Sequence, residues 1–114
     1  MTLNKGDVWF VDYPYEEDSK QSKRRPVVIV ETQDGFSLAI GIKVTTHAPR
    51  LWDPFDIEIK EYLLAGFKKP STARTAHNRE FITSKFLRQL GVLHRKDLLN
   101  VLRAYYQWRS KNSH

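Results

Sequence analysis

The segment Val44–Arg50 gathers several chemically useful side chains, because Thr45, Thr46, His47 and Arg50 all lie within it. An imidazole titrates near neutral pH, so His47 can serve as a general acid or a general base. Successive strand residues point to opposite faces, so only one of the two threonines is expected to face a site that contains His47. The alternative interpretation is a strand end with a solvated histidine.

A second basic segment, Lys23-Arg24-Arg25-Pro26, precedes a run of β-branched residues. Pro26 fixes its own backbone and favours extended geometry at Arg25. An arginine held in this way can present its planar fork to a phosphate. Taken alone, the segment is better explained as a charged flank that keeps a hydrophobic strand from aggregating.

A third polar segment runs from Ser71 to Arg79. Arg74 and His77 can approach the same cleft, whereas Arg79 can instead be structural and pair with an acidic residue of the segment Asp56–Glu58. No catalytic carboxylate stands out here, and Ala76 occupies a position where an acid would be useful.

Arginine, threonine and histidine together suit the cleavage of RNA by transphosphorylation. RNA carries its own nucleophile, the 2′-hydroxyl, so an enzyme needs a base, an acid for the 5′-oxygen, and cations for the crowded phosphorane. This reaction needs no metal or other cofactor. The sequence also offers no metal site, because its acidic residues are scattered and its histidines lack ligand spacing.

The chain has 114 residues, which predicts a single domain over residues 1–114. It contains no cysteine, which excludes disulfide scaffolds, cysteine-ligated zinc and cysteine nucleophiles. No apolar run approaches the roughly 20 residues of a membrane span, and the N-terminus has no signal-peptide core. We expect a soluble cytoplasmic protein with no membrane partner.

The net charge of +6 comes from the C-terminal part of the chain. Residues 1–82 hold 12 basic and 12 acidic side chains, whereas residues 83–114 hold seven basic and one acidic. A polyanionic partner, nucleic acid above all, is the functional interpretation. A solvated basic face that aids solubility is the alternative.

Hydrophobic alternation predicts strands over residues 8–13, 26–30, 36–46 and 55–59, with shorter ones at 72–76 and 81–82. Residues 15–24 are predicted to be a loop, residues 33–35 a hairpin turn, and residues 60–65 a short helix before Gly66.

The end of the chain has helical periodicity instead. Leu98, Val101, Leu102, Tyr105 and Trp108 share one face of a helix predicted over residues 95–108. That face is more typical of core than of a binding surface. The predicted fold is a mainly β, small antiparallel barrel of five or six strands with a long C-terminal helix.

Five blocks of the sequence, in order, resemble the MazF/PemK toxin family, the endoribonuclease halves of bacterial type II toxin–antitoxin pairs. The blocks are Lys5-Gly6-Asp7-Val8-Trp9-Phe10-Val11-Asp12, Lys23-Arg24-Arg25-Pro26-Val27-Val28-Ile29-Val30, Val44-Thr45-Thr46-His47, Lys69-Pro70-Ser71 with Arg74, and Leu90-Gly91-Val92-Leu93. The resemblance implies an SH3-like barrel, a homodimer, and metal-independent cleavage of single-stranded RNA to 2′,3′-cyclic phosphate and 5′-hydroxyl ends. It also implies a cognate antitoxin whose acidic, disordered tail fills the RNA groove.

The resemblance also implies roles for individual residues. Arg25, Thr45, Thr46, His47 and Arg74 match the catalytic set, with His47 as base or acid and the arginines stabilising the phosphorane. We expect the RNA to be bound by a further set of basic and aromatic residues: Lys20, Lys23, Arg24, Arg50, Trp52 and His77. Some family members carry an Asp two residues after the arginine, where this chain has Ala76. Either His47 takes over the proton transfer, or the chain is a weakened enzyme.

Two other functions compete with this interpretation. The barrel can be a non-catalytic module that binds nucleic acid or an acidic peptide, which would not need Arg25, His47 and Arg74 to converge. A toxin aimed at a protein such as a topoisomerase is a weaker alternative, because the Arg-Arg-Pro and Thr-Thr-His blocks argue against it. Trp52 can stack on an unpaired base or cap the barrel or a dimer contact.

Overall fold

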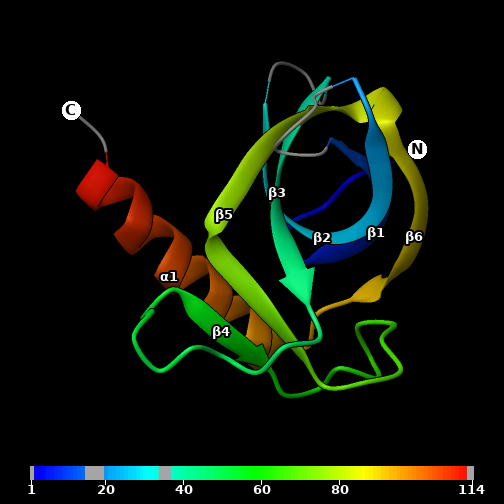
Figure 1. Ribbon diagram of the computed structural model, residues 1–114. Coiled ribbons are helices and arrows are strands. Elements are labelled where there is room, and N and C mark those ends of the chain that lie inside the picture. The colour runs from blue at the N-terminus through cyan, green and yellow to red at the C-terminus, as the bar shows by residue number, and fades with distance from the viewer. Residues whose placement is uncertain (1, 15–19, 34–36, 113–114) are drawn as a thin grey trace.

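The computed structural model describes residues 2–14, 20–33 and 37–112. One antiparallel sheet contains six strands in the order β4-β5-β3-β2-β1-β6, and a C-terminal helix packs against it (Figure 1). The elements, in chain order, are β1 (Asp7–Pro14), β2 (Ser22–Gln33), β3 (Leu38–Thr45), β4 (Asp56–Ile59), β5 (Ser71–Ile82), the 3₁₀ helix η1 (Thr83–Lys85), β6 (Phe86–Val92) and α1 (Arg95–Asn112). The predicted mainly β fold with a long C-terminal helix is confirmed, although β4 and β6 do not pair to close the sheet within the described residues.

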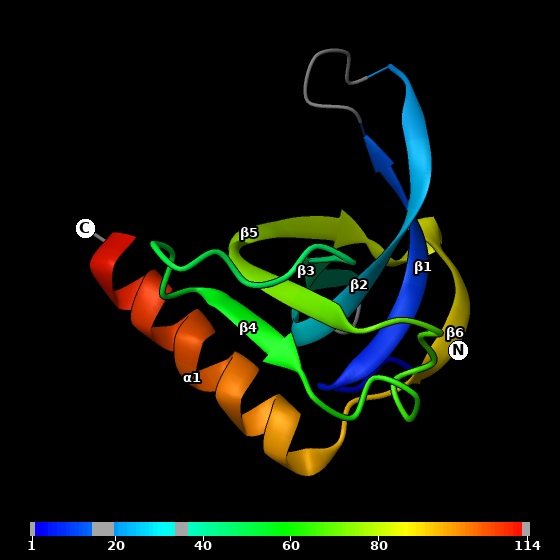
Figure 2. The same ribbon diagram turned by 60° about the horizontal axis from the view of Figure 1, so that its bottom comes forward.

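Both faces of the sheet are apolar, which explains why β2 has the uninterrupted run Val27–Val30. Val28 and Val30 pack with Val101 and Tyr105 of α1 in a helix-side core. Val27 and Ile29 lie on the other face, in an aromatic core with Trp9, Tyr13, Phe81 and Phe86. Figure 2 shows α1 running beside β4 along the sheet.

The aromatic core shows that the sheet curls on itself. Phe81 of β5 contacts Tyr13 of β1 and Phe86 of β6, with ring centroids 5.6 and 5.9 Å apart. Two strands separate β5 from β1 in the sheet, so only a strongly curved sheet can bring these rings together. Trp9 meets Phe86 edge to face at 6.1 Å.

Several predicted boundaries are wrong. The predicted strands at 72–76 and 81–82 are one strand, β5, and β6 was not predicted. β2 begins at Ser22, so Lys23 and Arg24 belong to a strand instead of the predicted loop. Residues 15–19 of that loop, and residues 34 and 35 of the predicted turn, lie outside the described residues.

The predicted short helix at 60–65 is also wrong, because this segment is a hydrogen-bonded turn. The N–H of Phe67 donates to the Tyr62 carbonyl at 3.0 Å, and that of Gly66 donates to Leu63 at 3.1 Å. This is the pattern that closes the end of a helix, with Gly66 at φ 93° as the left-handed residue. The segment therefore starts and ends within about one turn.

The predicted helix is confirmed and extends to Asn112, and Val101 and Tyr105 are fully buried on its predicted face. No helix among the described residues is long and apolar enough to cross a membrane.

Candidate active site

The register of four strands places the catalytic candidates on one face of the sheet. Val27 of the aromatic core pairs with Lys43, which pairs with Arg74, which pairs with Asp56. The next row on the same face joins Thr45 to Thr72 and Thr72 to Glu58. Paired residues share a face, so the aromatic core continues into a polar face. We define this polar face by Arg25, Lys43, Thr45, Asp56, Glu58, Thr72 and Arg74.

Arg25 joins this face from β2. Arg25 and Thr45 each lie two residues beyond the Val27–Lys43 pair, and strand side chains alternate with a period of two. Both therefore point to the same side as Val27 and Lys43. Arg24 points the other way and lines a different cleft of about 610 Å³ with Phe10, Leu87 and Arg88.

Two threonines hold the backbone of His47. The Thr72 hydroxyl donates to the His47 carbonyl at 2.7 Å, and Thr72 is almost fully buried. The His47 N–H donates to Thr45 Oγ1 at 3.3 Å. His47 itself is exposed and lines a cleft of about 290 Å³ with Thr46, Glu58 and Thr72 among its walls. Thr45 and Thr46 thus both lie at the candidate site, Thr45 on the polar face and Thr46 on the cleft wall.

The arginines at this site differ in how they are paired. Arg50 donates through Nε to Asp56 at 2.8 Å and through Nη2 to Asp53 at 2.9 Å. Among the described residues, neither Arg25 nor Arg74 forms an ion pair with a carboxylate, and Arg74 Nε is buried without a hydrogen-bond partner. The guanidinium groups of Arg25 and Arg74 are therefore not saturated by a carboxylate and can hydrogen-bond to a phosphate.

Asp56 is ionised and fixes the loop that leads into β4. Burial of its carboxyl acts to raise the pKa, but hydrogen bonds from the Arg50 side chain and backbone, together with the charges of Arg50 and Arg74, outweigh burial and lower the pKa. The same hydrogen bond raises the pKa of Arg50. Asp56 is thus paired with Arg50 rather than with Arg79, whose guanidinium lies 5.9 Å from the centre of the Tyr13 ring.

Trp52 extends from this anchored loop into solvent. The Arg50 guanidinium lies 4.6 Å from the centre of the indole ring, and Trp52 is 74% exposed. A rigid aromatic surface of this kind can stack on an unpaired base. Arg50 is therefore placed to orient Trp52 rather than to bind a phosphate itself.

The remaining candidates lie farther from the polar face. Lys23 pairs with Tyr13 and Arg24 with Asp12 at the end of β1 and β2 that projects beyond the sheet (Figure 2), and Lys20 is exposed just before β2. His77 lies in an irregular stretch of β5 between the paired residues Arg74 and Asn78.

Four site residues escaped sequence reasoning. Lys43 and Tyr13 meet at 6.0 Å, ammonium to ring centre, on the same side of the sheet as Arg74. Thr72 anchors His47, and Glu58 shares its cleft. The period-two spacing of Lys43 and Thr45 was a usable signal, whereas the pairing of β4 with β5 could not be read from spacing.

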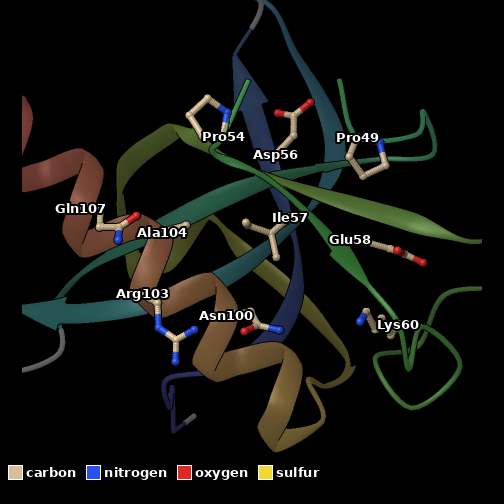
Figure 3. A pocket seen from close by; sticks show the side chains of 10 residues that line it. All are labelled: Pro49, Pro54, Asp56, Ile57, Glu58, Lys60, Asn100, Arg103, Ala104 and Gln107. Carbon is tan, nitrogen blue, oxygen red and sulfur yellow. The ribbon is translucent and has the colours of Figure 1, made fainter. Parts of the chain in front are cut away.

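A second hollow of about 370 Å³ separates β4 from α1 (Figure 3). Ile57 and Ala104 form part of its apolar wall, and Asn100, Arg103 and Gln107 form part of its polar wall. It lies between β4 and α1, and Asp56 and Glu58 of the polar face also contribute to its lining. Within the described residues, no group of three or more histidine or acidic side chains is placed to hold a metal ion.

Comparisons with known proteins agree with this architecture. The family described as PemK-like, MazF-like toxin of type II toxin–antitoxin system matches residues 4–108. MazF from Deinococcus radiodurans superposes with a TM-score of 0.75 at 17% identity, over 96% of this chain and 98% of that one. An endoribonuclease from a mycobacterial species, solved with its cognate antitoxin, gives 0.73 at 11% identity, over 99% and 100%.

A third structure, the Mycobacterium tuberculosis toxin MazF-mt6, gives a TM-score of 0.65 at 16% identity, over 90% of this chain and 96% of that chain. At these identities the structures show a shared fold. No curated protein is similar enough in sequence to match this chain.

Proposed function

This chain belongs to the family of PemK-like, MazF-like toxins of type II toxin–antitoxin systems, and from that membership we propose that it is an endoribonuclease that cleaves single-stranded RNA without a metal. The observation that carries the proposal is that Arg25 and Arg74, on the face that adjoins His47, form no ion pair with any carboxylate of the described residues. The 2′-hydroxyl attacks the adjacent phosphorus, the bond to the 5′-oxygen breaks, and the products carry 2′,3′-cyclic phosphate and 5′-hydroxyl ends.

Each part of this reaction has a candidate residue. Arg25 and Arg74 neutralise the charge that develops on the phosphorane, since neither forms an ion pair with a carboxylate among the described residues. His47 transfers a proton as acid or base, while Thr45 and Thr72 fix its backbone. Trp52 stacks on an unpaired base near the scissile bond, with Arg50 holding the indole in place.

The same membership supports proposals about partners. We expect a homodimer in the cytoplasm that is inhibited by a cognate antitoxin with an acidic, disordered tail, since a mycobacterial structure of this fold is a complex with its antitoxin. Lys20, Lys23, Arg24 and His77 are proposed as further contacts to the RNA backbone.

The direct test uses purified protein, a long single-stranded RNA and excess EDTA. Wild type should cut at a short recurring motif and leave 5′-hydroxyl ends. Arg25→Ala should abolish cutting, and His47→Ala should slow it by roughly 100- to 10,000-fold, the range for losing a general acid or base. A loss below about tenfold would remove His47 from the mechanism.

Absence of cleavage by wild type, with RNA still bound in a salt-dependent manner, would favour a binding module instead.

A further inference from the structure

Glu58 points toward the polar face, although it belongs to an edge strand. Its neighbours Ile57 and Ile59 pack in the helix-side core, so alternation directs Glu58 to the opposite side of β4. Figure 3 shows its carboxylate pointing away from α1. Glu58 pairs with Thr72, and Thr72 pairs with Thr45.

Glu58 and His47 line the same cleft. This hollow of about 290 Å³ is also lined by Thr72, the residue that holds the His47 carbonyl. The two side chains form no ion pair with each other in the described structure. A carboxylate and an imidazole therefore border one hollow of about 290 Å³, a volume that can hold a sugar and its phosphate.

Asp53 and Asp56, the two acidic residues that precede Glu58 in the chain, are already paired, because both accept hydrogen bonds from Arg50. Glu58 is the acidic residue among those that line the His47 cleft, and it has no ion-pair partner in the part of the chain that the structure describes. Two residues after Arg74, this chain has Ala76 and so lacks an acidic side chain at that position of β5. Glu58 supplies a carboxylate to the site from β4 instead.

The distances across the sheet suit this arrangement. Arg25, Thr45, Thr72 and Glu58 occupy four neighbouring strands in the order β2-β3-β5-β4. Adjacent strands lie about 4.8 Å apart, so the outer two backbones are separated by roughly 14 Å. Arginine and glutamate side chains are long enough to span part of this gap, and the two threonines lie between them in the sheet.

We propose that Glu58 is the general base of the RNA cleavage and that His47 is the general acid, an inference that rests on the proposed function. The Glu58 carboxylate accepts the proton of the 2′-hydroxyl as the 2′-oxygen bonds to phosphorus. The bond from phosphorus to the 5′-oxygen breaks, and the His47 imidazolium gives its proton to that oxygen. Hydrolysis of the cyclic phosphate is not needed for strand cleavage.

The test compares Glu58→Gln with the matched control Glu61→Gln on a defined RNA under single-turnover conditions. Gln keeps the shape of the side chain and removes the base, so Glu58→Gln should slow cleavage by about 100- to 10,000-fold. Glu61 is exposed on the turn after β4 and lies outside the cleft, so Glu61→Gln should cleave as wild type. RNA affinity should stay within a few-fold of wild type in both variants.

The pH profile separates a base from a merely structural residue. For wild type, the rate should rise with pH as Glu58 loses its proton and fall at higher pH as His47 loses its own. Glu58→Gln should lose the rising limb and keep the falling one. The charged groups around Glu58 are the same in both proteins: Asp56, Lys60 and Arg103 line the hollow between β4 and α1 with it, Arg50 pairs with Asp53 and Asp56, and Arg74 lies beside Asp56 in the sheet.

Each outcome bears on the proposal. Cleavage by Glu58→Gln within about threefold of wild type, or a rising limb that survives the substitution, would overturn the role of Glu58 while leaving the nuclease itself established. A wild-type protein that does not cut RNA would overturn both proposals. A large loss in Glu58→Gln with an unchanged circular dichroism spectrum and melting temperature would support the base.

Discussion

Asp97 ties the start of the helix to the end of β4, and its removal should destabilise the fold strongly. The side chain is almost fully buried, and its carboxylate accepts the backbone N–H groups of Lys60 and Glu61 at 3.1 and 2.9 Å. Asp97 also lies in the first turn of α1, where a negative charge complements the helix dipole. Three favourable interactions therefore depend on one carboxylate.

The magnitude follows from these contacts. A hydrogen bond to a charged group contributes about 1.5–3 kcal/mol, and a charge near a helix N-terminus contributes about 0.3–1 kcal/mol. Taking the low end of each range, because both amides are only partly buried, Asp97→Ala should lower the free energy of unfolding by about 3 kcal/mol. Asp97→Asn keeps one acceptor and should cost about half as much.

Urea denaturation of both variants gives the free energies directly, and a chain of this size should lose roughly 12 °C in melting temperature for Asp97→Ala. In Asp97→Ala, native-state hydrogen exchange should show a larger increase in rate at the Lys60 and Glu61 amides than at the amides of β4. The exposed residue Glu80 provides the control, since Glu80→Ala should change stability by less than about 0.5 kcal/mol. A loss of less than about 1 kcal/mol for Asp97→Ala would refute the reasoning.

Three further predictions concern the site and its supports. Trp52→Ala should weaken RNA binding by about 1–3 kcal/mol while Trp52→Phe loses less, as measured by fluorescence anisotropy, and equal affinity in all three proteins would exclude stacking. Gly66→Ala should cost more than about 2 kcal/mol in urea melts, because φ is 93° and an added Cβ would lie 2.3 Å from the Leu90 carbonyl oxygen; an unchanged midpoint would contradict this. Because folding lowers the pKa of Asp56, its stabilising contribution should be present above about pH 4 and be lost as pH falls through the folded-state pKa. Thermal melts should therefore show a shallower acid dependence for Asp56→Asn than for wild type.

The elements that the sequence predicted well are those with a strong local period. The alternation in Val8–Tyr13 and the helical spacing of Val101 and Tyr105 each identify a buried face, and both elements are present. β6 escaped prediction because it is an edge strand in which Leu87, Arg88 and Gln89 are all exposed, so no alternation marks it. Residues 60–65 were predicted to be a helix because Gly66 follows them. The segment forms the backbone hydrogen bonds that end a helix, but only over about one turn.

The candidate site was predictable only in part, for a related reason. Arg25, His47 and Arg74 stand out by residue type, and His47 also by its place just after β3. Glu58 and Thr72 become site residues only through the pairing of β4 with β5 and of β5 with β3, which are contacts between segments far apart in sequence. The charge count pointed to the basic C-terminal segment, whose helix contributes its buried face to the core, whereas the candidate site lies on the sheet.

Asp56 explains how a site can hold several arginines and still leave some of them free. The carboxylate has two cationic neighbours, Arg50 and Arg74, and it accepts all three of its described hydrogen bonds from Arg50. The charge of Arg74 is close enough to lower the pKa of Asp56, so Asp56 attracts Arg74 to its position without occupying its donors. An arginine that is hydrogen-bonded to a carboxylate must break that ion pair before it can bind a phosphate. An arginine that is only attracted to the carboxylate keeps its guanidinium N–H groups available. Arg50 is thus committed to the loop and to Trp52, whereas Arg74 forms no ion pair with a carboxylate within the described residues.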